Sequence, residues 1–250
     1  MTLPEWEERL ARFPVATPEL IQARDLLRRT DLKFVLSPEE AADLLPALEG
    51  GYARLTTGNG PVASYRSLYF DTPELEFFHA HRRGCRVRHK VRIRHYSDRQ
   101  LTMLEIKMRR SEFETRKISM EREYGDDILS EEDQRFVRAY TNVTGDVFPQ
   151  AWTRFRRAAL LGLKANERMT IDFDLAFDWE GHSRTLGHVA IVELKQWPFN
   201  PGSRVLSALR HVGRRAGWAS KYCAAIAFTR SDVRHNSLLP GLRALERSAA

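Results

Sequence analysis

The segment RVRHKVRIRH, residues 86–95, alternates basic and other side chains along its whole length. Side chains of a β-strand point alternately to its two faces, so as a strand this segment has one cationic face and one mostly apolar face. The cationic face carries Arg86, Arg88, Lys90, Arg92 and Arg94. A row of like charges is costly unless an anion neutralises it. The segment therefore predicts a strand with an anionic partner.

Further segments show the same alternation of charged and apolar side chains, namely 31–37, 101–109, 115–121, 152–158, 168–175 and 189–196. Their charged positions include Lys33, Glu105, Lys107, Lys117, Arg154, Arg156, Asp172, Asp174, Glu193 and Lys195. Helical patterns lie around and between the strands, at residues 4–12, 18–29, 37–48, 73–84, 130–142 and 203–217. Residues 220–230 are apolar and fit either a helix or a strand. The pattern predicts an α+β fold rich in antiparallel strands.

Two arrangements explain charged faces of this kind. An ordinary antiparallel sheet has one face in water, and for any single strand this is the simpler interpretation. Across the set, however, Lys and Arg dominate the charged faces, most densely in residues 86–94. We therefore expect a closed antiparallel β-barrel, a tunnel with a polar, basic lumen flanked by helices, because low-dielectric walls would focus positive potential on a phosphate chain.

The bulk composition agrees with an anionic ligand. The chain has 250 residues, a net charge of +7 and a pI of about 9.6. Its two cysteines, Cys85 and Cys223, predict neither a disulfide framework nor a metal motif, which favours a reducing, cytoplasmic location. We find no signal peptide and no apolar run near 18 residues, so the chain itself is not expected to be transmembrane. The basic strand lacks the interleaved aromatic residues that stack on bases, which argues against nucleic acid as the partner.

Nine short motifs stand in the order of a known family: LKFVLS, YRSLYFDTPELEFF, VRIRHY, LEIKMR, TRKISM, RFRRAAL, RMTIDFDL, IVELKQW and SKY. Through them the chain resembles the catalytic domain of the vacuolar transporter chaperone (VTC) family, the polyphosphate polymerase branch of the triphosphate tunnel metalloenzymes. The resemblance implies a tunnel domain over residues 30–230. From the sequence pattern we expect N-terminal helices over residues 1–29, packed on the barrel, and a loosely ordered C-terminal tail over 231–250.

The resemblance also implies roles for individual residues. Phosphates would be held by Lys33, Arg92, Arg94, Lys107, Lys117, Arg156, Lys195 and Lys221. Glu193 would bind the divalent metal, Mn²⁺ or Mg²⁺. Ser220 would contact phosphate at one tunnel mouth, and Arg154 would lie beside the phosphates where the family often has Tyr, two residues before the tunnel Arg.

Some positions depart from the wider pattern. Hydrolytic branches open with ExExK, whereas this chain has Arg29, Asp31 and Lys33, which argues against a simple triphosphatase. Trp218 stands where the polymerase pattern has a further Lys. The function implied is transfer of the γ-phosphoryl group of ATP to polyphosphate, with a membrane protein as a possible partner. A metal-dependent triphosphatase and a non-catalytic polyphosphate-binding module are the alternatives.

Overall fold

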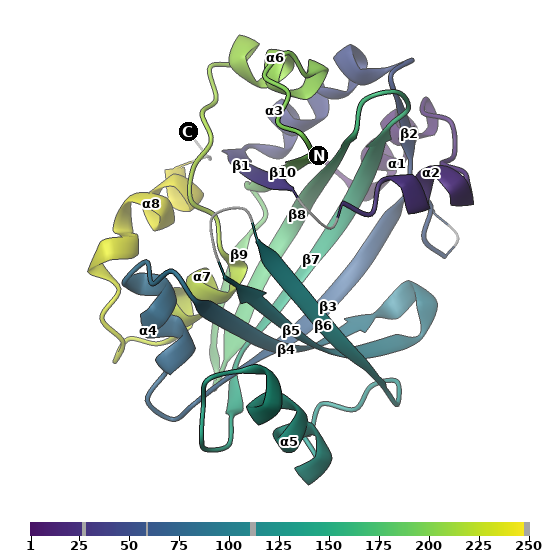
Figure 1. Cartoon of the computed structure of the whole chain (residues 1–250). Coiled ribbons are helices and arrows are strands. Elements are labelled where there is room, and N and C mark those ends of the chain that lie inside the picture. Colours follow the sequence, from purple (N-terminus) through teal and green to yellow (C-terminus); the bar gives the residue numbers. More distant parts are fainter. Residues whose placement is uncertain (27–28, 59, 111–113, 248–250) are drawn as a thin grey trace.

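The alternating segments of the sequence become neighbouring strands of one antiparallel sheet (Figure 1). The structure is a computed structural model that describes residues 1–26, 29–58, 60–110 and 114–247. Within these residues the sheet has ten strands, and its main path runs β1-β10-β8-β7-β3-β4-β5-β6, with β2 beside β7 and β9 beside β8. The strands are β1 (Thr30–Leu36), β2 (Tyr52–Arg54), β3 (Val62–Asp71), β4 (Arg88–Tyr96), β5 (Leu101–Arg109), β6 (Thr115–Arg122), β7 (Phe148–Gly162), β8 (Glu167–Trp179), β9 (His182–Leu186) and β10 (Ala190–Gln196).

Helices flank the sheet, as the sequence predicted. They are α1 (Leu3–Ala11), α2 (Pro18–Ala23), α3 (Pro38–Asp43), α4 (Glu76–Arg82), α5 (Glu131–Tyr140), α6 (Arg204–His211), α7 (Lys221–Thr229) and α8 (Leu239–Arg247). Local signals start several of them. Ser37 and Glu40 form a capping box at the start of α3, and Ser130 and Asp133 form another at α5. Figure 1 shows α3 and α6 at one end of the sheet, α5 at the opposite end, and α4, α7 and α8 along one side.

The apolar strand faces are buried beneath these helices. Trp6 of α1 stacks on Phe173 of β8, with ring centroids 4.7 Å apart, in a cluster that also includes Phe34 and Val192. On the other side, Ile93 of β4 belongs to a second cluster with residues of α4, α5, α7 and α8. Burial of these faces supplies the main driving force for folding and leaves the charged faces on the opposite, inner side of the sheet.

The expected closure of the sheet into a barrel is not found. Among the described residues, β1 and β6 are the two ends of the strand path and do not pair with each other. The free edge of β1 is met by another segment, because the backbone N–H of Gly217 donates to the Lys33 carbonyl at 2.8 Å. The segment before α7 therefore occupies part of the β1 edge along which β6 would have to form hydrogen bonds to close a barrel.

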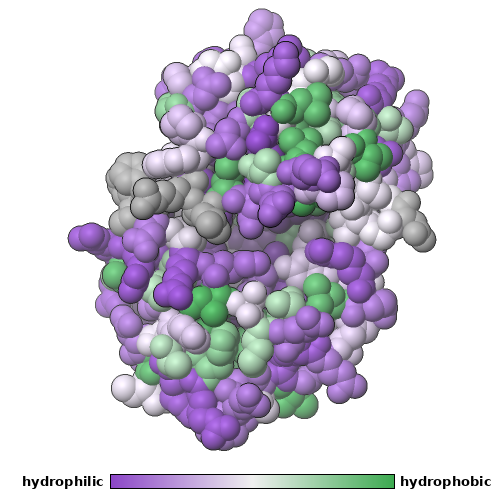
Figure 2. All heavy atoms as spheres, turned by 45° about the vertical axis from the view of Figure 1, so that its right-hand side comes forward, coloured by the Kyte–Doolittle hydropathy of each residue, from purple (hydrophilic) through white to green (hydrophobic). Residues whose placement is uncertain are grey.

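The sheet nevertheless curls on itself. The Nζ atom of Lys107 on β5 lies 4.0 Å from Oδ2 of Asp31 on β1, although these strands are far apart in the path. Figure 1 shows β1 and β10 on one side and β4–β6 on the other, with β3, β7 and β8 running between them. Figure 2 shows a hollow across the middle of one face, bordered mostly by hydrophilic side chains.

Several elements differ from the sequence-based expectation. The helix expected over 203–217 ends at His211, because Gly213 adopts a φ of 67° and its N–H bonds back to Arg210. Residues 221–229 are helical, and the expected loose tail contains α8, whose Leu242 and Leu245 are buried. The short strands β2 and β9 were not predicted. In the described part of the chain, no helix has the length and apolar character needed to cross a membrane.

Candidate functional site

Charged side chains cross the inner face of the sheet from strand to strand. The register places Lys33 opposite Glu193, and Arg92 opposite Glu105. The same face continues on β6, where Lys117 lies opposite Lys107. We call the space in front of this face the chamber; around it lie the side chains of Asp31, Lys33, Lys90, Arg92, Arg94, Glu105, Lys107, Lys117, Arg157, Asp172, Glu193, Lys195 and Lys221.

The N-terminus of α7 ties three strands together across the chamber. The Nζ of Lys33 on β1 donates to the carbonyl of Ala219 at 2.8 Å, and the Nζ of Lys90 on β4 donates to Oγ of Ser220 at 3.0 Å. Lys221 forms an ion pair with Asp172 of β8. Ser220 also caps α7 by accepting from the N–H of Cys223. These contacts place Ser220 and Lys221 at the chamber, beside Lys33 and Lys90.

Arg92 is half-buried and Arg94, two residues further along β4, is buried, and the two have different partners. Arg92 donates two hydrogen bonds to Oε2 of Glu105, at 2.7 and 2.5 Å, and Lys117 reaches Oε1 of the same carboxylate at 3.2 Å. Arg94 donates to Oγ of Ser67 at 3.0 Å and forms no ion pair within the described residues. Arg94 is only 5% exposed, and Glu105 offsets its charge without a direct ion pair, so an anion in the chamber would be favoured beside it.

Glu193 lies within a cluster of lysines. Its Oε2 is 2.5 Å from Nζ of Lys195, and its Oε1 is 3.8 Å from Nζ of Lys33. Burial favours the neutral acid, but Lys195, Lys33 and Lys107 outweigh it and hold the pKa of Glu193 well below its usual range. Glu193 is therefore a carboxylate in an otherwise cationic setting.

We tested whether these residues suit the divalent metal that the resemblance implies. The described residues contain no cluster of three or more His, Cys, Asp or Glu side chains that could enclose a metal. Glu193 lies opposite Thr170, whose buried Oγ1 has no hydrogen-bond partner. One carboxylate and an orphaned hydroxyl suit Mg²⁺ or Mn²⁺, which take several ligands from phosphate and water. Glu105 is unsuited to this role, because Arg92, Lys117 and the Tyr96 hydroxyl already occupy its oxygens.

The chamber lysines are crowded, and Lys195 and Lys221 are also largely shielded from water. Burial, with Lys195 and Lys33 nearby, lowers the pKa of Lys107 to about 7 against the opposing effect of Glu193. Burial likewise lowers the pKa of Lys221 to about 8, although Asp172 opposes it. A bound polyanion would stabilise the charged form of these ammonium groups and raise their pKa values. The clustered lysines therefore favour polyanion binding.

The structure does not bring Arg154 and Arg156 into the chamber. Arg156 lies opposite Phe173 on the outer face and pairs with Asp174, while Arg154 pairs with Asp178. The register between β7 and β8 shifts between Arg154 and Arg156. The expected placement of these two arginines on the inner face is therefore wrong: they share one face of β7, and the opposite face is the one that turns inward.

Arg157 occupies the inner position instead, and the sequence analysis missed it. Its Nε lies 2.5 Å from Oδ1 of Asp172. Two residues before it, the Phe155 ring faces the cations of Arg94 and Lys221. With Arg157 as the inner arginine, an aromatic residue stands where the family often has Tyr. The RFRRAAL motif contains three arginines, so its sequence alone offered no signal to choose between them.

Tyr69 is a second missed residue. Its hydroxyl accepts from Nη1 of Arg92 at 3.2 Å on the inner face. Burial favours the neutral phenol, but Arg92, Arg94 and Lys90 outweigh it and lower the pKa of Tyr69 to about 8. The YRSLYFDT motif placed it on a strand, yet alternation alone does not distinguish an inner Tyr from a core Tyr.

A cavity of about 310 Å³ opens onto the chamber between β1, β4, β5 and the segment before α7. We call it the mouth cavity; its lining residues are Asp31, Lys33, His81, Arg88, Lys90, Lys107, Arg109, Thr115, Gly217, Trp218, Ala219 and Ser220. Cations dominate this lining, as a phosphate ligand requires.

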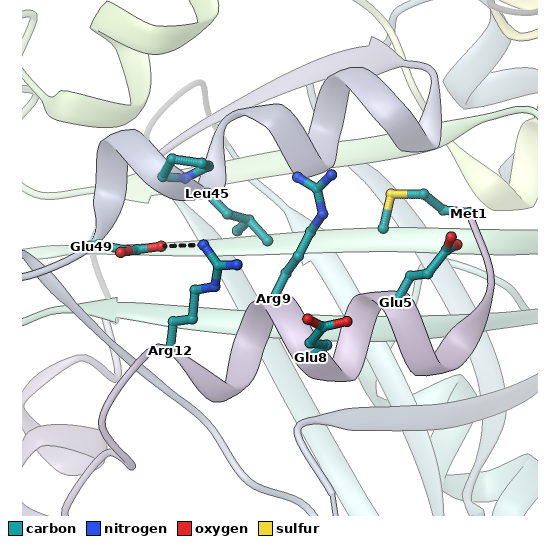
Figure 3. A pocket seen from close by; sticks show the side chains of 8 residues that line it. Met1, Glu5, Glu8, Arg9, Arg12, Leu45 and Glu49 are labelled. Carbon is teal, nitrogen blue, oxygen red and sulfur yellow. Dashed lines mark ion pairs between the residues drawn. The ribbon is translucent and has the colours of Figure 1, made fainter.

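A larger cavity of about 450 Å³ lies between α1 and the segment Leu45–Glu49 (Figure 3). Its carboxylates and arginines are mixed, and Arg12 lies 3.8 Å from Glu49. Its charges largely cancel, so it does not offer a phosphate site.

A search of curated proteins returned no match. A solved structure titled as a putative adenylyl cyclase from Hippeastrum with a dominant triphosphatase activity is 16% identical, with a TM-score of 0.51, and covers 83% of this chain and 99% of its own. A solved structure titled as a putative adenylate cyclase from Bacillus halodurans is 12% identical, with a TM-score of 0.45. The match covers 74% of this chain and 87% of that one. At these identities the first similarity describes the fold alone.

The sequence itself matches a family model over most of its length. The VTC domain model covers residues 28–230, which include all the chamber residues from β1 to α7. The chain therefore belongs to the VTC domain family.

Proposed function

We propose that this chain is a polyphosphate polymerase that transfers the γ-phosphoryl group of ATP to a growing polyphosphate chain. The bond between the γ-phosphorus and the β–γ bridging oxygen breaks, a bond to a terminal phosphate oxygen of the chain forms, and ADP leaves. The proposal rests on the VTC domain and on the inner row of lysines and arginines, which matches a linear polyanion.

The state of the chamber carboxylates supports a polymerase over a hydrolase. Asp31, Glu105, Asp172 and Glu193 each face lysine or arginine side chains within ion-pair distance. Carboxylates held in this way are poor bases for activating water. A terminal phosphate oxygen is already anionic, so it needs positioning and charge neutralisation more than a base.

The chain's cations would supply that neutralisation. Four cations on the three strands β4, β5 and β7 would spread the charge of the transferring group, namely Arg92, Arg94, Lys107 and Arg157. A divalent ion held at Glu193 would neutralise phosphate oxygens and polarise the transferred group.

The test is incubation of the purified protein with ATP and Mn²⁺, with products resolved on a gel and free phosphate assayed in parallel. Long chains that disappear in Glu193→Ala support the proposal. Failure to form chains while polyphosphate binds tightly would instead indicate a binding module.

A metal-dependent triphosphatase is the second candidate, and Tyr69 favours it. A buried phenol with a pKa of about 8 that accepts a hydrogen bond from Arg92 would serve as the base for water. Free phosphate without chains, reduced strongly in Tyr69→Phe, would establish this alternative over the polymerase.

We also infer a cytoplasmic location and a membrane protein that receives the product. Both cysteines are free, and Cys223 is buried, which suits a reducing compartment. Cell fractionation and cross-linking in intact cells would test these two inferences.

A further inference from the structure

The mouth cavity combines a cationic inner side with an aromatic rim. Lys33, Lys90 and Lys107 reach it from three strands, while Trp218 lines it from the segment before α7. His81 also lines the cavity, and burial together with Lys90 and Arg88 lowers its pKa to about 2, so its ring is uncharged. The lysines of this lining can bind phosphates, and Trp218 with the uncharged His81 can contact a flat, uncharged ring.

Trp218 is held in place by the C-terminal helix. A Cβ atom at Gly241 of α8 would lie 2.9 Å from Cδ2 of the indole, and closer still to Cε3. Only glycine therefore allows α8 to pack against the indole in this position. The buried Leu242 and Leu245 anchor α8 to the same core cluster that Trp218 packs against. The indole is thus a fixed surface at the mouth.

The indole is also available to a ligand. Within the described residues, Trp218 stacks on no other aromatic ring, and it remains partly exposed where it lines the cavity. Stacking on a fixed aromatic ring loses little conformational entropy when a ligand binds.

We propose that the base of a nucleoside triphosphate stacks on Trp218 while its phosphates extend past Lys33 and Lys90 into the chamber. This inference rests on the proposed function and names the residue that distinguishes ATP from inorganic phosphate chains. Tripolyphosphate has the same run of phosphates but no base, so Trp218 would favour ATP over it.

The test compares the affinities of ATP and inorganic tripolyphosphate by titration calorimetry. Stacking of one base predicts that Trp218→Ala weakens ATP binding roughly 5- to 100-fold and changes tripolyphosphate binding less than about twofold. Trp218→Phe should restore most of the ATP affinity, since it retains a ring. Trp197→Ala is the matched control, because Trp197 is exposed and does not line the mouth cavity.

Two further measurements separate stacking from a structural role. Gly241→Leu should displace the indole and reproduce the loss of ATP affinity without touching a chamber residue. ATP should quench tryptophan fluorescence in the wild type more than tripolyphosphate does, and this difference should vanish in Trp218→Phe.

Equal losses for ATP and tripolyphosphate in Trp218→Ala would overturn the inference, as would a wild type that binds both ligands equally well. Either result leaves the proposed function intact, because tripolyphosphate still binds. A wild type that binds neither ligand would overturn the proposed function and this inference with it.

Discussion

Arg157 pairs with Asp172 on the inner face of the sheet, while its neighbour Arg156 pairs with Asp174 on the outer face. The two arginines are adjacent in sequence and have opposite surroundings. Arg157 is flanked by the rings of Phe155 and Tyr65, each with its centroid 5.3 Å from the guanidinium carbon. Substitutions of Arg157 and Arg156 can therefore be compared directly, the first as a test of phosphate binding in the chamber and the second as its control.

We expect Arg157→Gln to weaken metal-free binding of tripolyphosphate at least about tenfold, because a hydrogen bond to a charged group contributes roughly 1.5–3 kcal/mol. Titration calorimetry in EDTA measures the loss. Arg156→Gln, as the control, should change the affinity less than about twofold. A larger effect from Arg156 than from Arg157 would contradict the placement of the inner face.

Phosphate binding should depend on pH through Lys107 and Lys221, whose pKa values are about 7 and about 8. A bound polyanion stabilises their charged forms and raises both pKa values, so binding takes up protons between about pH 7 and 9. Affinity should therefore fall as the pH rises through this range. Calorimetry in buffers of different ionisation enthalpy measures the proton uptake, and Lys107→Met should reduce it near pH 7. Proton release on binding would contradict this prediction.

Glu193→Gln should separate metal binding from phosphate binding. Removing one negative charge from the lysine cluster should leave metal-free affinity for tripolyphosphate unchanged or raised, while activity with Mn²⁺ falls at least about 100-fold if the carboxylate holds the ion. Thermal unfolding monitors the accompanying loss of its ion pair with Lys195. Full activity in Glu193→Gln would exclude the carboxylate as the metal ligand.

Trp6→Ala should destabilise the fold without altering the chamber. The side chain is fully buried and stacks on Phe173, so its removal should cost about 3–5 kcal/mol of unfolding free energy. Denaturant unfolding measures this loss, and tripolyphosphate affinity below the transition should be unchanged. An unaltered midpoint would mean that α1 contributes little to the outer core.

The strand alternation predicted much of the chamber because period-two patterning is a local property. Lys33, Arg92, Arg94, Lys107, Lys117 and Lys195 lie on the inner face that the alternation assigned to them. Arg156 was misplaced because alternation along β7 separates Arg156 from Arg157 but does not say which of the two faces turns inward. The sequence also did not reveal that β1 and β6 remain unpaired. That gap depends on a contact between Gly217 and Lys33, which are far apart in the chain.

The C-terminal region was underestimated for a similar reason. Helix α8 has little to mark it in the sequence besides its spaced leucines, and it gains its order from packing on a core that other elements build. Trp218 was recognised only as a missing lysine, whereas its setting against Gly241 emerges from tertiary contact.

The pairing of β1 with β10 joins residues 30–36 to residues 190–196. Strand β1 therefore leaves the ribosome long before its partner β10 has been synthesised. Closing so long a loop carries a large entropic cost before any contact repays it, so the N-terminal strand should be among the last to acquire stable order. A nascent chain that stops before β10 would expose that strand edge, which makes this region the point at which interrupted synthesis leads to aggregation.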